Sequence, residues 1–114
     1  MKYYDEAQMK EIRSSLEERI LEWRGVSTRE MMGCLCYFYG SKFFAFLVTK
    51  GIVITKLSDE DRTRLSKLAK AGPFDMAGRT VKTWIRIAVN KPEDLKAVIP
   101  FVKKSYEVAS QSNK

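Results

Sequence analysis

The residues that could do chemistry in this chain are few, and none of them forms a recognisable catalytic set. Cys34 and Cys36 lie two positions apart, and the carboxylates of Asp59, Asp61 and Asp75 follow no known acid–base pattern. The chain has no histidine, the usual base at neutral pH, and two thiols alone do not complete a zinc site. We therefore predict a protein that is not an enzyme and that needs no metal or cofactor.

One strand combines an aromatic residue with cations in a way that is typical of nucleic-acid binding. Lys82, Trp84 and Arg86 alternate within a predicted strand from 81 to 89, so their side chains lie on one face. The indole can stack on a base while the neighbouring cations contact phosphates. The alternative is that Trp84 packs beneath the last helix and the two cations extend into water.

Two further groups of basic residues are candidate contacts. Four cations share one face of a predicted helix, where they could bind a phosphate backbone or simply face solvent. They are Arg62, Arg64, Lys67 and Lys70. Arg29 and Arg79 lie next to glycine-containing ends of strands, where each could hold an anion or a partner's carboxylate. Their alternative role is structural pairing, for example with Glu30 or Asp75.

The net charge favours anionic partners. The chain carries a formal charge of +7, and residues 25–114 hold sixteen Lys and Arg against eight Asp and Glu. Residues 1–24 hold five against six, so the excess belongs to the later part of the chain. Basic surfaces attract nucleic acid through phosphate contacts and counterion release. The simpler reading is that lysines keep a small protein soluble.

Apolar spacing and capping residues predict three helical regions. The first begins after Asp5 and ends near Gly25, and the second begins after Ser58 and stops before Gly72. A short helical turn begins at Pro92, and a longer helix runs from Pro100 to about Ala109, because proline is tolerated only in the first turn.

Between Arg29 and Leu57 the chain predicts a three-stranded meander, with turns at Gly40-Ser41 and Lys50-Gly51. The run 43–48 has no polar face, so both faces of this sheet must be buried. Either helices cover both faces or a second copy of the chain covers one, and we expect a homodimer formed through the apolar sheet. The strand at 81–89 has a short predicted partner at 74–76.

These elements predict a single α+β domain over residues 1–109. It has two layers and an antiparallel sheet in the order α-β-β-β-α-β(-β)-α, and residues 110–114 are predicted to form a disordered tail. Folding of 114 residues buries enough surface for a core without disulfides or metals. No segment reads as a signal peptide or a membrane span, so we expect a protein of the reducing cytoplasm.

The pattern resembles the TfoX/Sxy N-terminal domain family. The segments that carry the resemblance are Arg29-Glu30-Met31-Met32-Gly33, Tyr37-Phe38-Tyr39-Gly40, Phe43-Phe44-Ala45-Phe46-Leu47, Gly51-Ile52-Val53-Ile54-Thr55-Lys56-Leu57, Pro73-Phe74, Gly78-Arg79, Trp84 and Pro100-Phe101-Val102-Lys103-Lys104. The resemblance implies a fold in which helices pack on an antiparallel sheet, similar to secretion-chaperone-like and YjbR-like domains. Longer members regulate competence for DNA uptake and append a second helical domain, so we expect a stand-alone copy.

The charge, the candidate contacts and the family resemblance together predict a function for this chain. The chain is predicted to be a non-enzymatic regulatory module that binds nucleic acid or protein and is linked to transcription or competence. One alternative is a homodimeric adaptor domain with no nucleic-acid contact. The second is a small-molecule binder or an enzyme, which would require a deep pocket with convergent polar groups.

Overall fold

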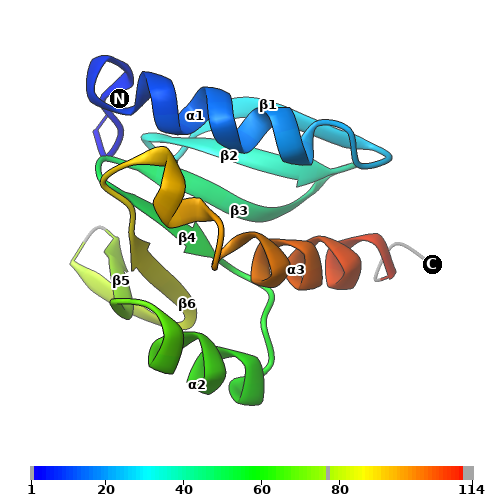
Figure 1. Ribbon diagram of the computed structural model, residues 1–114. Helices are drawn as coiled ribbons and strands as arrows, with labels where there is room; N and C mark the ends of the chain where they lie inside the picture. Colours follow the sequence, from blue (N-terminus) through cyan, green and yellow to red (C-terminus); the bar gives the residue numbers. More distant parts are fainter. Residues whose placement is uncertain (1, 77, 112–114) are drawn as a thin grey trace.

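The computed structural model describes residues 2–76 and 78–111, which form an α+β domain with one antiparallel sheet (Figure 1). The sheet has six strands in the order β1-β2-β3-β4-β6-β5. The strands are β1 (Val26–Met31), β2 (Cys34–Tyr39), β3 (Lys42–Val48), β4 (Gly51–Ile54), β5 (Ala71–Met76) and β6 (Arg79–Ala88). The helices are α1 (Glu6–Ile20), α2 (Asp59–Leu68), the 3-10 helix η1 (Pro92–Leu95) and α3 (Ile99–Gln111). The predicted fold class is confirmed.

The helices begin where the capping residues place them. The Asp5 carboxylate accepts the N–H of Ala7 at 3.0 Å, and the Ser58 hydroxyl accepts the N–H of Asp61 at 3.1 Å. These bonds satisfy backbone donors that have no partner within the first turn of a helix. Helix α3 continues through residues 110 and 111, which the sequence assigned to a disordered tail, whereas 112–114 lie outside the described residues.

The meander has one strand more than predicted, because a turn at the start of the first apolar run pairs β2 with the more polar strand β1 before it. β1 and β2 are joined by Met32 and Gly33, whose φ angles of 59° and 75° define a two-residue turn of the kind that matches strand twist. A Cβ at Gly33 would lie 2.9 Å from the Cβ of Lys2, so the turn also needs glycine for space. The signal available in the sequence was Gly33 itself, which interrupts the apolar residues on either side of it.

The run 43–48 contains a β-bulge, and it shows no polar positions because both faces of the sheet are buried there. Tyr37 pairs with Ala45 but Phe38 pairs with Phe43, which leaves Phe44 as an extra residue on β3. The bulge shifts the phase of the strand, so Phe44 and Ala45 both point to the helical side. Ala45 and Leu47 therefore lie on the helical side, whereas Phe46 and Val48 lie on the opposite side.

The helical face of the sheet carries the larger core. Figure 1 shows α1 and α3 lying over this face, and the apolar residues of α1 at Met9, Ile12, Leu16 and Ile20 are buried there. A polar contact anchors α1, since the Tyr37 hydroxyl donates to Glu17 Oε2 at 2.8 Å and Arg13 Nε donates to the same oxygen at 2.9 Å. Burial and the carboxylate of Glu17 raise the pKa of Tyr37 far above its usual value.

The face of the sheet opposite α1 and α3, which we call the back face, is covered by the chain itself. Phe46 on β3 and Phe74 on β5 have ring centroids 5.4 Å apart. In a flat sheet of this strand order, three strand spacings, or about 14 Å, would separate them. The sheet therefore curls strongly, and β5 closes over the back face. Tyr3 covers one end, since its N–H donates to Gly33 O at 2.8 Å and its ring lies 5.8 Å from that of Phe74.

The curl has a local origin in the pairing of β5 with β6. Pro73 pairs with Ile85, but the next residue, Phe74, pairs with Val81. The pairing of the two strands therefore skips Lys82, Thr83 and Trp84 of β6. Bulges bend the strand that carries them and increase its twist. The outer part of the hairpin can therefore fold over the back face, which buries Phe74 to 6% exposure.

This arrangement corrects the alternatives drawn from the sequence. Neither a second helical layer nor a second copy of the chain is needed, because the back face is buried within one chain. The apolar face on which the predicted homodimer was based is therefore buried within one chain. Cys34 and Cys36 are free thiols in this back-face core, where burial raises their pKa values to about 12 and about 11.

Candidate nucleic-acid interface

Trp84 belongs to the core more than to the surface. Its ring centroid lies 5.6 Å from that of Phe43 and 5.3 Å from that of Phe46, both nearly perpendicular to it. We call the rings of Phe38, Phe43, Phe46, Phe74 and Trp84 the aromatic cluster. Trp84 is not beneath the last helix, as the structural alternative proposed, but on the opposite face. The half-buried indole offers little free ring surface for a base, and Lys82 beside it is exposed.

Arg86 lies two residues farther along the same face and is exposed. One of its terminal nitrogens, Nη2, donates to the carbonyl of Thr49 at 3.0 Å, which holds the guanidinium against the turn between β3 and β4. A Cβ placed on Gly51 would approach Arg86 Nε to 3.0 Å, so the guanidinium passes directly over a glycine. Arg86 is thus a fixed cation at the surface.

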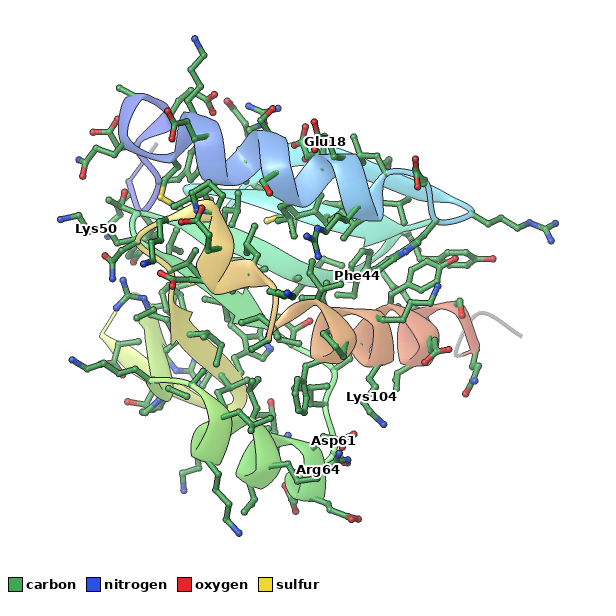
Figure 2. The ribbon with its side chains drawn as sticks, viewed as in Figure 1. Glu18, Phe44, Lys50, Asp61, Arg64 and Lys104 are labelled. Atoms are coloured by element: carbon green, nitrogen blue, oxygen red, sulfur yellow. The ribbon has the colours of Figure 1, made fainter. Side chains whose placement is uncertain are left out.

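The basic face of α2 is largely neutralised by its own first turn. Arg62 forms an ion pair with Asp59, and Arg64 pairs with Asp61 at 3.2 Å. Figure 2 shows Lys104 of α3 directed toward this site, where its Nζ lies 3.8 Å from Asp61 Oδ2. Lys67 is exposed on the helix, and Lys70 lies beyond its end. The four residues therefore do not act as one cationic surface.

Arg29 and Arg79 are both exposed but far from each other in the sheet order. The guanidinium of Arg29 lies over the ring of Phe38, 4.3 Å from its centroid, which is a cation–π contact. Arg79 begins β6 opposite Met76. The ion pairs found within the described residues include neither Arg29 with Glu30 nor Arg79 with Asp75.

Three hollows that share lining residues follow one another along one edge of the molecule, and we call their joint lining the basic groove. The first two share Asn90, and the second and third share Pro73 and Arg86. Six cationic side chains line the groove, and all six are exposed. They are Lys10 and Lys91 in the first hollow, Lys50, Lys70 and Arg86 in the second, and Lys2 in the third.

Cations outnumber acids in the basic groove, although an adjoining hollow that shares Lys70, Ala88 and Asn90 with the second one also holds Glu93 and Asp94. Against the six cations, its lining contains two acids, Glu11 and Asp75. Asp75 already accepts a hydrogen bond from the Thr80 hydroxyl. The ion pairs identified over residues 2–76 and 78–111 involve none of the six cations. Figure 2 shows Lys50 at this edge, extending away from the body of the domain.

The groove combines residues that sequence reasoning treated separately or missed. Arg86 and Lys70 were candidates, whereas Lys2, Lys10, Lys50 and Lys91 were not. These six come from the N-terminal segment, α1, the turn between β3 and β4, the residue before β5, strand β6 and the residue before η1. Only the fold brings them together, so no local run of charge could reveal them.

The fold and the site define a small α+β domain that carries three α-helices and a short 3-10 helix, within the described residues, on a curled antiparallel sheet with a basic edge. Its sequence matches the TfoX N-terminal domain family over residues 18–109, which is most of the chain, and the protein belongs to that family. A search of curated proteins found no match. Membership of this family supports, at most, the assignment of a regulatory domain that is associated with competence. Over the described residues, none of the helices has the length and apolarity required to cross a bilayer.

Proposed function

We propose that this domain is a non-enzymatic regulatory module that binds nucleic acid by holding its sugar–phosphate backbone in the basic groove. The observation that carries the proposal is the collection of six exposed cations around three hollows that share lining residues, with two acids in the same lining. Such a surface releases counterions from nucleic acid when it binds. A link to transcription or competence rests on the family alone.

The composition of the groove favours recognition of phosphates rather than bases. Five of its six cations are lysines, whose flexible ammonium groups act as point charges. Trp84, the predicted stacking residue, is engaged in the aromatic cluster instead. We therefore expect binding that depends little on sequence and strongly on salt.

Fluorescence anisotropy with a labelled DNA duplex and a labelled single strand tests the proposal. Between about 50 and 200 mM salt, the logarithm of the binding constant should fall linearly with the logarithm of salt concentration, with a slope of roughly −0.9 for each phosphate contact. Replacing Lys50, Lys70 and Arg86 together by Gln should reduce that slope by about 3 and weaken binding by more than about tenfold.

A matched control removes the same charge elsewhere. Lys67, Arg79 and Lys82 are exposed and lie outside the basic groove. Their triple replacement by Gln should reduce the slope by less than about 1, since only the diffuse attraction of the net charge is lost. Equal effects of the two triple variants, or no binding at the lowest salt, would contradict the proposal.

The homodimer and the cytoplasmic location stay predictions. The sheet face that suggested pairing is buried within the chain, so the proposed binding mode uses a single copy.

A further inference from the structure

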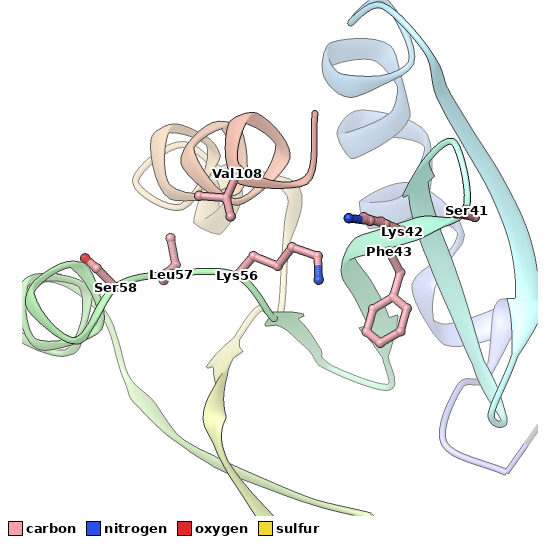
Figure 3. A pocket seen from close by; sticks show the side chains of 7 residues that line it. All are labelled: Ser41, Lys42, Phe43, Lys56, Leu57, Ser58 and Val108. Carbon is pink, nitrogen blue, oxygen red and sulfur yellow. The ribbon is translucent and has the colours of Figure 1, made fainter. Parts of the chain in front are cut away.

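The second hollow of the basic groove, which we call the central hollow, has the features of a small-ligand site in its own right. Its volume is about 400 Å³, within the range of about 300–1,000 Å³ that is usual for such sites. Its lining contains the cations Lys50, Lys70 and Arg86, and none of the described residues in that lining is acidic. The larger cleft in Figure 3, of about 770 Å³, shares no lining residue with it.

The end of β6 holds the backbone of both lysines. The N–H of Ala88 donates to Lys70 O at 3.0 Å, and the N–H of Val89 donates to Lys50 O at 2.9 Å. Lys70 precedes β5 and Lys50 precedes β4, and these two strands flank β6 in the sheet. The two lysines therefore join the lining of the central hollow from opposite sides of β6.

Arg86 lies between them, next to residues that have no side chain. Its partner on β5 is Gly72, and a Cβ added to Gly51 on β4 would lie 3.0 Å from Arg86 Nε. Opposite residues of antiparallel strands share a face, and a Cβ added to Gly72 would meet no atom within 4 Å. There is therefore open space beside the guanidinium. Its Nη2 donates to Thr49 O, and its remaining N–H groups can bind an anion.

The charge of these three cations is not balanced by ion pairs within the described part of the chain. Two acids, Glu93 and Asp94, line the adjoining hollow. Asp94 Oδ2 already accepts the N–H of Asn90 at 2.9 Å and that of Lys91 at 3.3 Å. Because like charges gathered around one hollow repel one another, a bound polyanion would be stabilised there.

We infer that the central hollow binds an oligophosphate group, either inorganic or carried by a nucleotide. Linked phosphates present several charged oxygens close together, which suits three cations better than a single carboxylate does. Arg86 can donate to two phosphate oxygens at once, and the lysines act as point charges beside it. The ligand would occupy cations that nucleic acid uses, so it would compete with nucleic acid. For this regulatory consequence alone, the inference rests on the proposed function.

Titration of ¹⁵N-labelled protein with sodium triphosphate, at a constant ionic strength of about 0.15 M, tests the inference by NMR. Saturable shifts should appear at the amides of Gly51, Gly72 and Arg86, but not at those of Phe43 and Val108 in the cleft of Figure 3. Inorganic phosphate carries less charge and should bind at least about tenfold more weakly. Tighter binding of ATP than of triphosphate would assign the site to nucleotides, and weaker binding would assign it to inorganic oligophosphate.

Two variants separate a shaped site from diffuse attraction. Gly72→Ile fills the space beside Arg86 without changing the charge, and β-branched residues suit a strand, so triphosphate should bind at least about fivefold more weakly. Lys70→Gln with Arg86→Gln should weaken it at least about tenfold. The matched control, Lys67→Gln with Lys82→Gln, removes two exposed cations outside the groove and should change the affinity less than about twofold. ¹⁵N spectra of the free variants show whether the fold is kept.

Unsaturable shifts, equal binding of phosphate and triphosphate, or unaltered affinity of folded Gly72→Ile would each overturn the inference, because each indicates diffuse attraction alone. In the anisotropy assay, triphosphate should displace the DNA duplex more effectively than phosphate at equal ionic strength, and saturation without displacement would contradict the competition. A duplex that binds while triphosphate does not saturate would reject this inference and keep the proposed function. Triphosphate that binds where no duplex does would reject the proposed function and keep the site.

Discussion

The aromatic cluster and the basic groove share strand β6 but differ in almost every physical respect. Trp84 and Arg86 are two residues apart on the same face of that strand, yet Trp84 packs against Phe43 and Phe46 while Arg86 is exposed beside Lys50 and Lys70. One region is held together by perpendicular rings, and the other gathers like charges from separate segments.

The difference teaches that a common face does not imply a common role. Alternation along a strand determines on which side a residue lies, but the curl of the sheet determines what covers that side. The hairpin of β5 and β6 bends over the back face at Phe74, so the part of the face near Trp84 is closed. The part near Arg86 stays open at the edge.

The largest expected effect tests whether the aromatic cluster is a true core. Phe46→Ala should lower the free energy of unfolding by about 3–5 kcal/mol, because it leaves a cavity among packed rings. Phe44→Ala is the matched control, since Phe44 is equally buried but faces the helices. Urea denaturation should give losses of similar size. A loss below about 1 kcal/mol for Phe46→Ala alone would show that the cluster is a surface feature.

An intermediate effect is expected at the turn that supports the closed end of the back face. Gly33→Ala should cost about 1–3 kcal/mol, since the residue has a φ of 75° and an added Cβ would meet Lys2. Gly72→Ala is the control, because nothing lies within 4 Å of its added Cβ. Its stability should change by less than about 1 kcal/mol. Equal costs in thermal denaturation would contradict the role given to the turn.

The smallest effect concerns the thiols in the back-face core. Burial raises the pKa values of Cys34 and Cys36 to about 12 and about 11, so the unfolded chain loses these protons first as pH rises. Their contribution to stability is therefore complete below about pH 9 and declines above it. Urea midpoints at neutral and alkaline pH should fall less steeply for Cys34→Ala than for the parent protein. An identical slope would contradict the assignment.

Much of the fold could be predicted because it depends on local signals. Asp5 and Ser58 cap their helices through side chains a few residues away, and Ile85 and Ile87 alternate with Trp84 and Arg86 as expected. The hairpin turn at Gly33 and the bulge at Phe44 were missed, because one apolar run concealed a turn and the other a change of phase.

The site was predictable only in part. Arg86 and Lys70 stood out as basic residues, but the basic groove also needs Lys2, Lys10, Lys50 and Lys91, which are distant along the chain. Conversely, the local group on α2 contained its own neutralising acids, Asp59 and Asp61, three residues before Arg62 and Arg64. On α2, cations and acids that are close in sequence neutralise one another. The cations of the basic groove are distant in sequence, and only the fold brings them together.

The most direct test of this division compares Trp84→Leu with Arg86→Gln in the same two assays. Trp84→Leu should lower the free energy of unfolding by about 1–3 kcal/mol while the folded protein binds nucleic acid as before. Arg86→Gln should change stability by less than about 0.5 kcal/mol and reduce the salt slope of binding by about 1. The opposite pattern, with binding lost in Trp84→Leu and kept in Arg86→Gln, would contradict the account.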